Sequence, residues 1–420
     1  MKLGKIFGKV AIKRLSRVET HPGTSRQHEI NGVKGLVDIF GKPSGKETFP
    51  ARFLFADDSD SPGSGMPKIA VSGDGEFVTW YDSRLNQPER SPEYRLYYSS
   101  DFIQNHAEEG DLLVVGFDGT RAWLVIARRG STVESQLLWM FTGRNAEFSG
   151  TRLVVEDVPE HPEILGGVEK LILESLGIEG SVADLPDPEE LAAHFGGTFP
   201  TTREFSAYAR SRTGIESSLD DPDRVLLEWW NMEEKLFYSL EKYILERKIE
   251  QGFENTEDFI AFALSVINRR KSRAGHAFEN HIEQVFLDHG VSHTRGGRTE
   301  GKSKPDFIFP SEEAYRKAAS LKVPPDTCID ILGAKTTCKD RWRQVTREAD
   351  ILETKHLLTL EPAISTDQTD EMKKLSLQLV VPKEIIPTYR DSQQSWLMDL
   401  AGFISMRLEK QRKEECRSHA

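Results

Sequence analysis

The sequence predicts a two-part protein, with a mostly β N-terminal barrel and a C-terminal α/β region in which helices flank a small central sheet. Short apolar runs separated by polar turns fill residues 1–148, and helical spacing begins near residue 186, before strands alternate with helices. Regular short strands are typical of barrels, and helix–strand alternation is typical of α/β domains. We therefore expect domains at 1–148 and 186–420. Between them, residues 149–185 are expected to form a linker that carries one short helix near 168–176.

Within the N-terminal part, the apolar runs 112–117 and 122–127 are separated by Asp-Gly-Thr, which indicates a β-hairpin. In the C-terminal part, apolar periodicity predicts a long helix over 222–250 and a second one that is capped at 256–258. The basic run 269–273 is expected to precede or open a further helix that carries Glu279. Later elements are three strands and a last helix, at 305–309, 328–334, 377–381 and 392–410.

Composition and cysteine content indicate the cellular compartment of the protein. The chain has 420 residues, 38% of them hydrophobic, and only three cysteines. No apolar run approaches the ~18 residues of a membrane helix, and the basic N-terminus lacks a signal-peptide core. We expect a reduced, cytoplasmic protein with no membrane partner.

The net charge of −12 argues weakly against nucleic acid as a partner. Positive charge is nevertheless concentrated in two runs, 269–273 and 335–347, while acidic residues gather elsewhere. Local charge decides binding more than the total does, so the distribution is compatible with DNA binding.

The candidate catalytic residues lie at the ends of two expected strands. Asp306 follows Pro305 at the start of one expected strand, Lys335 closes a second, and Glu348 is expected on the helix that follows. Paired strand ends would bring Asp306 and Lys335 to one sheet edge. Carboxylates that hold Mg²⁺ beside a lysine are suited to phosphodiester hydrolysis. A Pro-Asp pair is also common in turns, so the spacing alone leaves that alternative open.

The surrounding segments resemble the EcoRII-type restriction endonucleases of the PD-(D/E)XK superfamily. The resemblance spans roughly 186–405 and is carried by residues 268–275 (NRRKSRAG), 304–311 (KPDFIFPS), 335–344 (KTTCKDRWRQ), 356–360 (HLLTL) and 379–382 (LVVP). It implies a restriction-endonuclease-like fold with a central mixed sheet flanked by helices.

The resemblance implies a catalytic set. Asp306 and Glu348 are expected to bind Mg²⁺, with Lys335 as the catalytic lysine. Glu279 is expected to be a helix carboxylate facing the site, and Tyr315 an active-site tyrosine. A surface acid at 279 and a packing residue at 315 are the structural alternatives.

The resemblance also implies residues that contact DNA. Lys339, Asp340 and Arg341 match the segment with which these enzymes read adjacent C·G pairs. Lys and Arg can donate to guanine, and Asp can accept from cytosine. Arg343 and Arg273 are expected near phosphates, or else in solvent. Trp230 is expected near a pocket for flipped central bases, with core packing as the alternative.

Residues 1–148 resemble, more weakly, the B3-like effector-binding pseudobarrel of the same enzymes, through 12–16 (IKRLS), Gln27-His28 and 80–84 (WYDSR). One DNA-gripping arm would contain Arg26 and His28. The other would contain Arg84, Arg90 and Arg95.

Together these matches imply a Mg²⁺-dependent type II restriction endonuclease that cuts double-stranded DNA at a short CC…GG palindrome. It would form a homodimer through the catalytic domain and be activated by a second DNA copy at the N-terminal domain. Two other functions stay open: a repair or junction nuclease, and a non-catalytic DNA-binding regulator.

Overall fold

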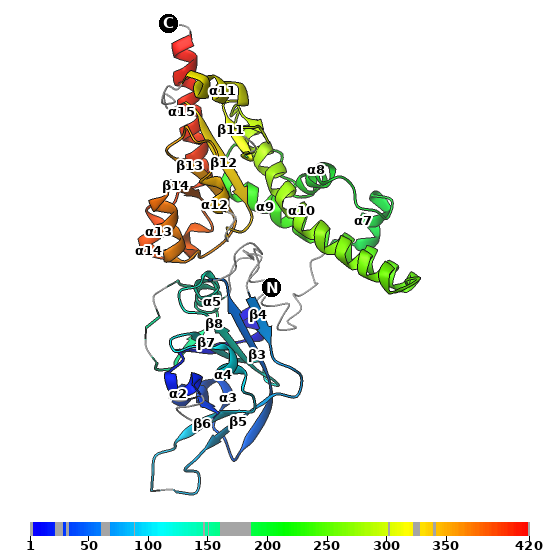
Figure 1. Cartoon of the computed structure of the whole chain (residues 1–420). Helices are drawn as coiled ribbons and strands as arrows, with labels where there is room; N and C mark the ends of the chain where they lie inside the picture. Colours follow the sequence, from blue (N-terminus) through cyan, green and yellow to red (C-terminus); the bar gives the residue numbers. More distant parts are fainter. Residues whose placement is uncertain are drawn as a thin grey trace. The chain divides into compact units, whose positions relative to one another are not determined.

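The computed structural model describes residues 3–21, 28–30, 33–59, 68–87, 89–145, 148–149, 151–159, 186–300, 303–321, 328–338 and 342–418. The chain divides into two compact units, one built mainly from residues 1–180 and the other mainly from residues 181–420 (Figure 1). The helix predicted near 168–176 lies outside the described residues. No helix in the described ranges has the length and apolar character needed to cross a membrane.

The first unit is a mostly β structure, as predicted, built on a curled half-barrel sheet. Its strand order is β2-β6-β5-β3-β8-β7-β1-β9, with β4 paired to β3. The strands are β1 Lys9–Arg14, β2 Glu29–Ile30, β3 Glu47–Asp57, β4 Lys68–Val71, β5 Phe77–Asp82, β6 Tyr94–Tyr98, β7 Leu112–Phe117, β8 Ala122–Ala127 and β9 Val154–Asp157. The predicted hairpin is confirmed, because β7 and β8 pair antiparallel from Leu112↔Ala127 to Phe117↔Ala122.

The long strand β3 curls this sheet. Residues 47–50 pair antiparallel with β5, whereas residues 51–56 pair parallel with β8. Side chains alternate along β3, so Phe53 and Phe55 enter one core cluster while Leu54 and Ala56 enter another. Both faces of the middle strands are therefore covered, which explains why β7 and β8 are apolar runs without a polar face.

Short helices cover these two faces. They are α1 Leu3–Ile6, α2 Arg17–Thr20, η1 Val33–Leu36, α3 Val37–Phe40, α4 Phe102–His106 and α5 Thr132–Thr142. Helix α5 packs through Val133, Leu137 and Phe141 into the cluster that contains Leu54.

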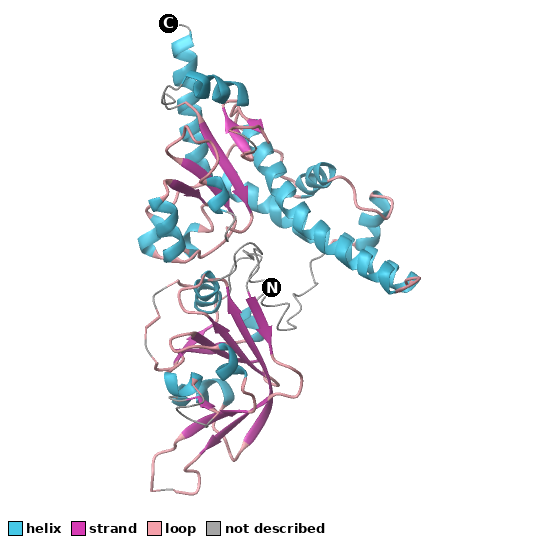
Figure 2. Ribbon diagram, in the orientation of Figure 1, coloured by secondary structure: helices cyan, strands magenta, loops and turns pink. Residues whose placement is uncertain are grey.

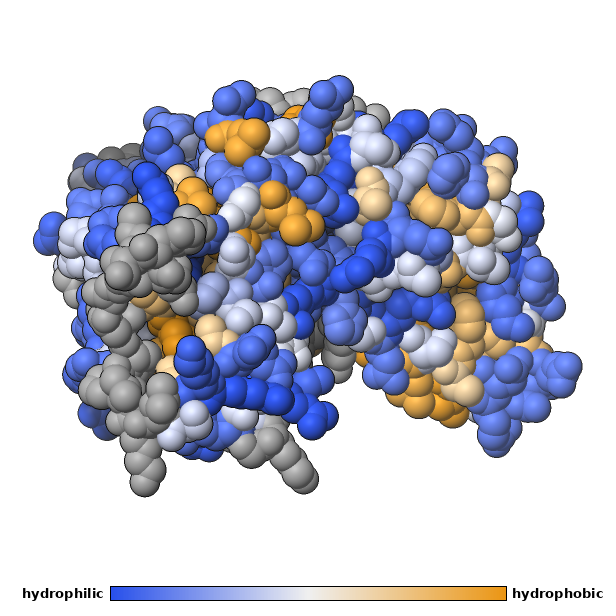
Figure 3. Space-filling model, turned by 90° about the horizontal axis from the view of Figure 1, so that it is seen from above, coloured by the Kyte–Doolittle hydropathy of each residue, from blue (hydrophilic) through white to orange (hydrophobic). Residues whose placement is uncertain are grey.

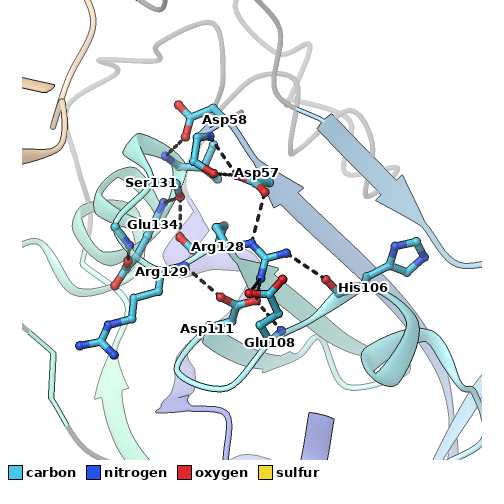
Figure 4. A network of polar contacts seen from close by, with 12 residues as sticks. Asp57, Asp58, His106, Glu108, Asp111, Arg128, Arg129, Ser131 and Glu134 are labelled. Atoms are coloured by element: carbon cyan, nitrogen blue, oxygen red, sulfur yellow. Dashed lines mark hydrogen bonds and ion pairs between the residues drawn. The ribbon is translucent and has the colours of Figure 1, made fainter. Parts of the chain in front are cut away.

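A polar network around Arg128 fixes the turn between β8 and α5 (Figure 4). Arg128 Nε donates to Asp57 Oδ2 at 3.2 Å, and its Nη1 lies 3.0 Å from Asp111 Oδ2 and 3.0 Å from Glu108 Oε2. The Arg128 carbonyl accepts from Ser131 Oγ at 2.7 Å. Because Ser131 also caps α5, the guanidinium joins a strand, a loop and a helix start.

The second unit contains a mixed sheet flanked by helices, as predicted. The order is β10-β11-β12-β13-β14, with antiparallel pairing as far as β12 and parallel pairing beyond it. The strands are β10 Thr294–Arg295, β11 Phe307–Phe309, β12 Asp330–Lys335, β13 Lys355–Thr359 and β14 Leu377–Val380. Figure 2 shows helices on both sides of this sheet. The helices of this part of the chain are α7 Pro188–His194, α8 Thr202–Arg212, α9 Pro222–Gln251, α10 Thr256–Asp288, α11 Glu312–Leu321, α12 Trp342–Val345, α13 Thr366–Lys374, η3 Ile386–Thr388, α14 Asp391–Gln394 and α15 Leu400–Ser418.

Helices α10 and α15 cover one face of this sheet. The ring of Phe286 on α10 lies 5.3 Å from those of Phe307 and Phe309, and Phe403 on α15 lies 5.5 Å from Phe309. On the same face, Asp330 is buried in an ion pair with Arg407 of α15. Helix α12 packs on the opposite face, where Val345 lies close to Gly333.

Two helix predictions were wrong. Helix α10 is continuous over 33 residues, so the run 269–273 lies inside it and does not open a new helix. A single glycine, Gly275, is tolerated in a helix interior. The last helix is interrupted instead, because Asp223 accepts the Leu400 and Ala401 N–H groups and so starts α15 only there.

Candidate active site

The ends of β11 and β12 meet as the sequence predicts. Ile308 pairs with Ile331, so Asp306, two residues before Ile308, lies on the same sheet face as Lys335. Lys335 Nζ donates to Asp306 Oδ2 at 2.6 Å, and the Ala334 N–H donates to the same oxygen at 2.7 Å. The carboxylate is thereby fixed beside the ammonium group.

Helix α12 brings Glu348 to this face. The helix has a single turn, so Glu348 lies in the bend after it and not on the helix, which corrects the prediction. Only 5% of Glu348 is exposed, and Gln344 Nε2 donates to its Oε1 at 3.3 Å. Burial raises the pKa of Glu348 to about 7; the charge of Asp306 adds to the rise and that of Lys335 opposes it.

The donor set fits a divalent cation. Two carboxylates, Asp306 and Glu348, act on each other electrostatically, and burial penalises the charge on Glu348. A bound cation would relieve both effects. Among the described residues, no group of three or more His, Cys, Asp and Glu side chains is arranged to hold a metal. Mg²⁺ commonly uses one or two carboxylates and completes its shell with water and substrate phosphate, so two carboxylates suffice.

Glu279 contacts Arg295 on β10. This strand pairs with β11, which begins directly after Asp306. Glu279 Oε2 accepts from Arg295 Nη2 at 3.0 Å and from Nε at 3.2 Å. Arg295 belongs to β10 and pairs with Phe307. The carboxylate thus lies near the edge where β11 begins and is engaged by an arginine.

Tyr315 is buried on α11, with 1% of its surface exposed. Its hydroxyl donates to Glu300 Oε1, and Glu300 Oε2 accepts the Asp350 N–H at 3.2 Å. Burial, followed by the hydrogen bond to Glu300, raises the pKa of Tyr315 above its usual value. No local pattern in the sequence indicates Glu300, because its partners are distant along the chain.

Arg273 is inside the helical layer, since only 8% of it is exposed. It pairs with Glu234, its Nη1 lies 3.4 Å from Glu233 Oε1, and its guanidinium stacks 4.0 Å from the Phe237 ring. Trp230 is half-buried, with its ring 5.8 Å from that of Phe278. These contacts place Arg273 away from the surface on which a phosphate contact was expected.

Arg343 forms two hydrogen bonds with Glu371, at 3.2 and 2.7 Å, and lies 4.7 Å from the Trp342 ring. The three predicted base-reading residues lie outside the described residues: Lys339, Asp340 and Arg341. Just before them, the Cys338 N–H donates to buried Glu361.

The N-terminal candidates gather at the β2-β6-β5 end of the sheet. Arg26 lies outside the described residues. His28 precedes β2, lies 3.1 Å from Asp101, and stacks on Tyr98 with ring centroids 5.3 Å apart. Hydrogen-bonded strands therefore bring the two predicted arms to one region of this unit.

The arginines of the second arm have partners within the unit. Arg84 lies 2.8 Å from Glu93, and Arg95 lies 2.7 Å from Glu29 and 3.2 Å from Glu93. Arg90 donates to the Gln87 amide at 3.3 Å.

Comparisons with known proteins find similarity in the C-terminal part of the chain. The family model "EcoRII C terminal" matches residues 237–404. The type II restriction enzyme EcoRII of Escherichia coli is 41% identical over 208 residues, which cover 49% of this chain and 50% of that enzyme. The matched region thus spans about half the length of that relative.

Two solved structures are also similar. A complex of metal-depleted Ecl18kI with uncleaved, modified DNA has a TM-score of 0.44 at 18% identity, covering 54% of this chain and 84% of that one. A PspGI restriction endonuclease–substrate DNA complex has a TM-score of 0.42 at 16% identity, covering 51% and 94%. The resemblance read from the sequence is confirmed over residues 237–404, which match the EcoRII C-terminal model and carry Asp306, Lys335 and Glu348.

Proposed function

We propose that this chain is a Mg²⁺-dependent type II restriction endonuclease that hydrolyses double-stranded DNA at a short CC…GG palindrome. The contact between Lys335 Nζ and Asp306 Oδ2, with buried Glu348 beside it, carries the proposal. It lies within residues 237–404, which the EcoRII C-terminal model matches.

Each residue of the site has a distinct proposed role in catalysis. Asp306 and Glu348 would hold Mg²⁺, which supplies Lewis acidity toward the scissile phosphate and lowers the pKa of bound water. Lys335 would orient the attacking water and stabilise negative charge that develops on the phosphate. Asp306 restricts the lysine to one position by accepting its hydrogen bond.

Recognition is proposed for Lys339, Asp340 and Arg341, because Lys and Arg donate to guanine O6 and N7 and Asp accepts from cytosine N4. They follow Lys335 closely in the chain. A mismatched base pair would then disturb the segment that carries the catalytic lysine.

We also propose a modular chain with an effector-binding domain at 1–148, a linker at 149–185 and a catalytic domain at 186–420. A second DNA copy would bind the N-terminal domain at the β2-β6-β5 end, where His28, Arg84, Arg90 and Arg95 are found. Binding there would favour an active state of the catalytic domain. Such an enzyme would act in the cytoplasm.

A homodimer through the catalytic domain is supported by one surface. The N-terminal half of α10 extends away from the sheet and carries Phe259, Ile260, Leu264 and Ile267, which are 51%, 50%, 54% and 48% exposed. Positions 260, 264 and 267 follow helical spacing on one face. Apolar side chains are exposed toward the right of Figure 3, the side toward which α10 extends in Figure 1. A second copy of the same stripe would bury it.

Plasmid cleavage tests the function. The purified chain is incubated with plasmid in Mg²⁺ or in EDTA, and the ends of the products are sequenced. Discrete fragments with CC…GG ends are expected only in Mg²⁺. Asp306→Asn and Lys335→Met should each lower the rate by at least about 100-fold, whereas Lys317→Met, on the exposed face of α11, should cut normally.

Other outcomes would support the other functions. Cuts at branched or damaged DNA without sequence preference would indicate a repair or junction nuclease. Tight DNA binding with no cleavage in Mg²⁺ or Mn²⁺ would indicate a regulator. Full activity of Lys335→Met would contradict the assignment of the site.

A further inference from the structure

The bend that carries Glu348 has a costly backbone conformation. Ala349, the next residue, has φ 55° and is fully buried. A residue with a Cβ adopts this left-handed conformation only when surrounding contacts enforce it. The direction of the Glu348 side chain therefore depends on what holds the two ends of the bend.

Two side chains hold those ends. Lys355 Nζ donates to the Thr346 carbonyl at 2.7 Å, two residues before Glu348. Glu300 Oε2 accepts the Asp350 N–H at 3.2 Å, two residues after it. Both contacts are made to the backbone, so they fix its path directly.

Glu300 is itself held by Tyr315. Its second oxygen, Oε1, accepts from the Tyr315 hydroxyl, which α11 buries. A raised pKa keeps that hydroxyl protonated and able to donate. One carboxylate thus uses a separate oxygen for each partner.

Glu300 also belongs to the loop that leads to Asp306. The Ser303 N–H donates to the Glu300 carbonyl at 3.0 Å, and the Gly296 N–H donates to the Asp306 carbonyl at 2.9 Å. The loop that positions one carboxylate of the site therefore carries the side chain that holds the bend of the other.

We propose that Glu300 and Tyr315 form a clamp that sets the position of Glu348 relative to Asp306. Both are positioning residues: Glu300 holds the Asp350 N–H, and Tyr315 holds Glu300 and also interacts with the Ile351 backbone N–H. The inference rests on the proposed function, because the spacing of Asp306 and Glu348 that the clamp would set matters for Mg²⁺ binding in such an enzyme.

Hydrogen–deuterium exchange of the full chain tests the clamp without metal, DNA or activity. In Glu300→Ala, amides of residues 346–352 should exchange about tenfold faster, as expected for a lost hydrogen bond, while the melting temperature stays near that of the wild type. Glu300→Gln should restore protection, because its amide oxygen accepts from Asp350 and its NH₂ group donates to the Tyr315 oxygen. Tyr315→Phe should give an intermediate rate. Glu313→Ala, on the exposed side of α11, is the matched control.

Cleavage assays then link the clamp to function. Glu300→Ala should lower kcat and raise the Mg²⁺ concentration needed for half-maximal rate, with KM for DNA unchanged and Glu300→Gln near wild type.

Unchanged exchange at 346–352 in Glu300→Ala, or faster exchange throughout the domain, would overturn the clamp. If Glu300→Ala does not fold, exchange in Tyr315→Phe decides in the same way. A wild-type chain that never cleaves would refute the proposed function, and the exchange data would still decide whether the clamp exists.

Discussion

Gly333 and Val345 lie so close together that a Cβ on Gly333 would come within 2.7 Å of Val345 Cγ2. Gly333 lies in the middle of β12, two residues before Lys335, and Val345 ends α12, three residues before Glu348. The missing side chain lets α12 approach the sheet. The distance between the lysine and the second carboxylate thus depends on a glycine that takes no part in the chemistry.

Replacing Gly333 with alanine should separate these elements. We expect Gly333→Ala to destabilise the domain by about 1–3 kcal/mol, the usual cost of overpacking, and to reduce cleavage more than DNA binding, because Glu348 moves. Urea unfolding and cleavage rates check both effects. Gly275→Ala, where a Cβ meets nothing within 4 Å, should be neutral or stabilising; an equal loss in both variants would contradict the argument.

Breaking the buried ion pair between Asp330 and Arg407 should be costly. Arg407 is 1% exposed, pairs with Asp330 and also donates to the Cys328 carbonyl at 3.0 Å. Arg407→Met should lower the free energy of unfolding by about 3 kcal/mol, since a buried carboxylate loses its main partner. Lys410→Met should cost less, because the more exposed Lys410 only supplements the pair. Denaturant midpoints measure both, and the reverse order would contradict the prediction.

His356 should make the stability of the second unit depend on pH. Burial lowers its pKa to about 4, from 6.5 when unfolded, with Asp330 opposing the shift. Between these values the unfolded chain binds the extra proton, so His356 by itself should lower the free energy of unfolding by about 3 kcal/mol at most as the pH drops from 6.5 to 4. The raised pKa of Glu348 acts in the opposite direction, because there the folded chain binds the extra proton. Thermal unfolding of the wild type and of His356→Leu isolates the histidine: the stability of the variant relative to the wild type should rise as the pH falls, and a constant difference would contradict the prediction.

The exposed stripe on α10 should control the oligomeric state. Ile260→Glu with Leu264→Glu is expected to convert a dimer into monomers that remain folded, because both side chains are exposed in the single chain. Light scattering after gel filtration measures the mass. Leu287→Glu, at the other end of α10 and 61% exposed, serves as the control. A monomeric wild type would refute the homodimer.

Features set by local patterns were predictable from the sequence. The hairpin of β7 and β8 follows from two apolar runs around Asp-Gly-Thr. The meeting of Asp306 and Lys335 follows from their positions at the ends of adjacent strands. In both cases, the residues that determine the geometry are close to the features they determine.

Features set by distant contacts were not predictable. The bend at Glu348 is held by Glu300 and Lys355, and neither contact leaves a local pattern. The continuity of α10 through a basic run depends on packing partners on α9, such as Glu233 for Arg273. Gly333 is the exception, since a glycine inside an apolar strand indicates a close approach of another element.

Strand β12 also constrains how sequences of this kind can change. Asp330 points to the face covered by α15, and Lys335 points to the face covered by α12. Adjacent residues of a strand alternate between faces, so these two must stay an odd number of positions apart. Insertions or deletions between them should therefore occur only in pairs, unless a bulge absorbs a single residue. An alignment of relatives would reveal this as a parity rule on the length of one strand.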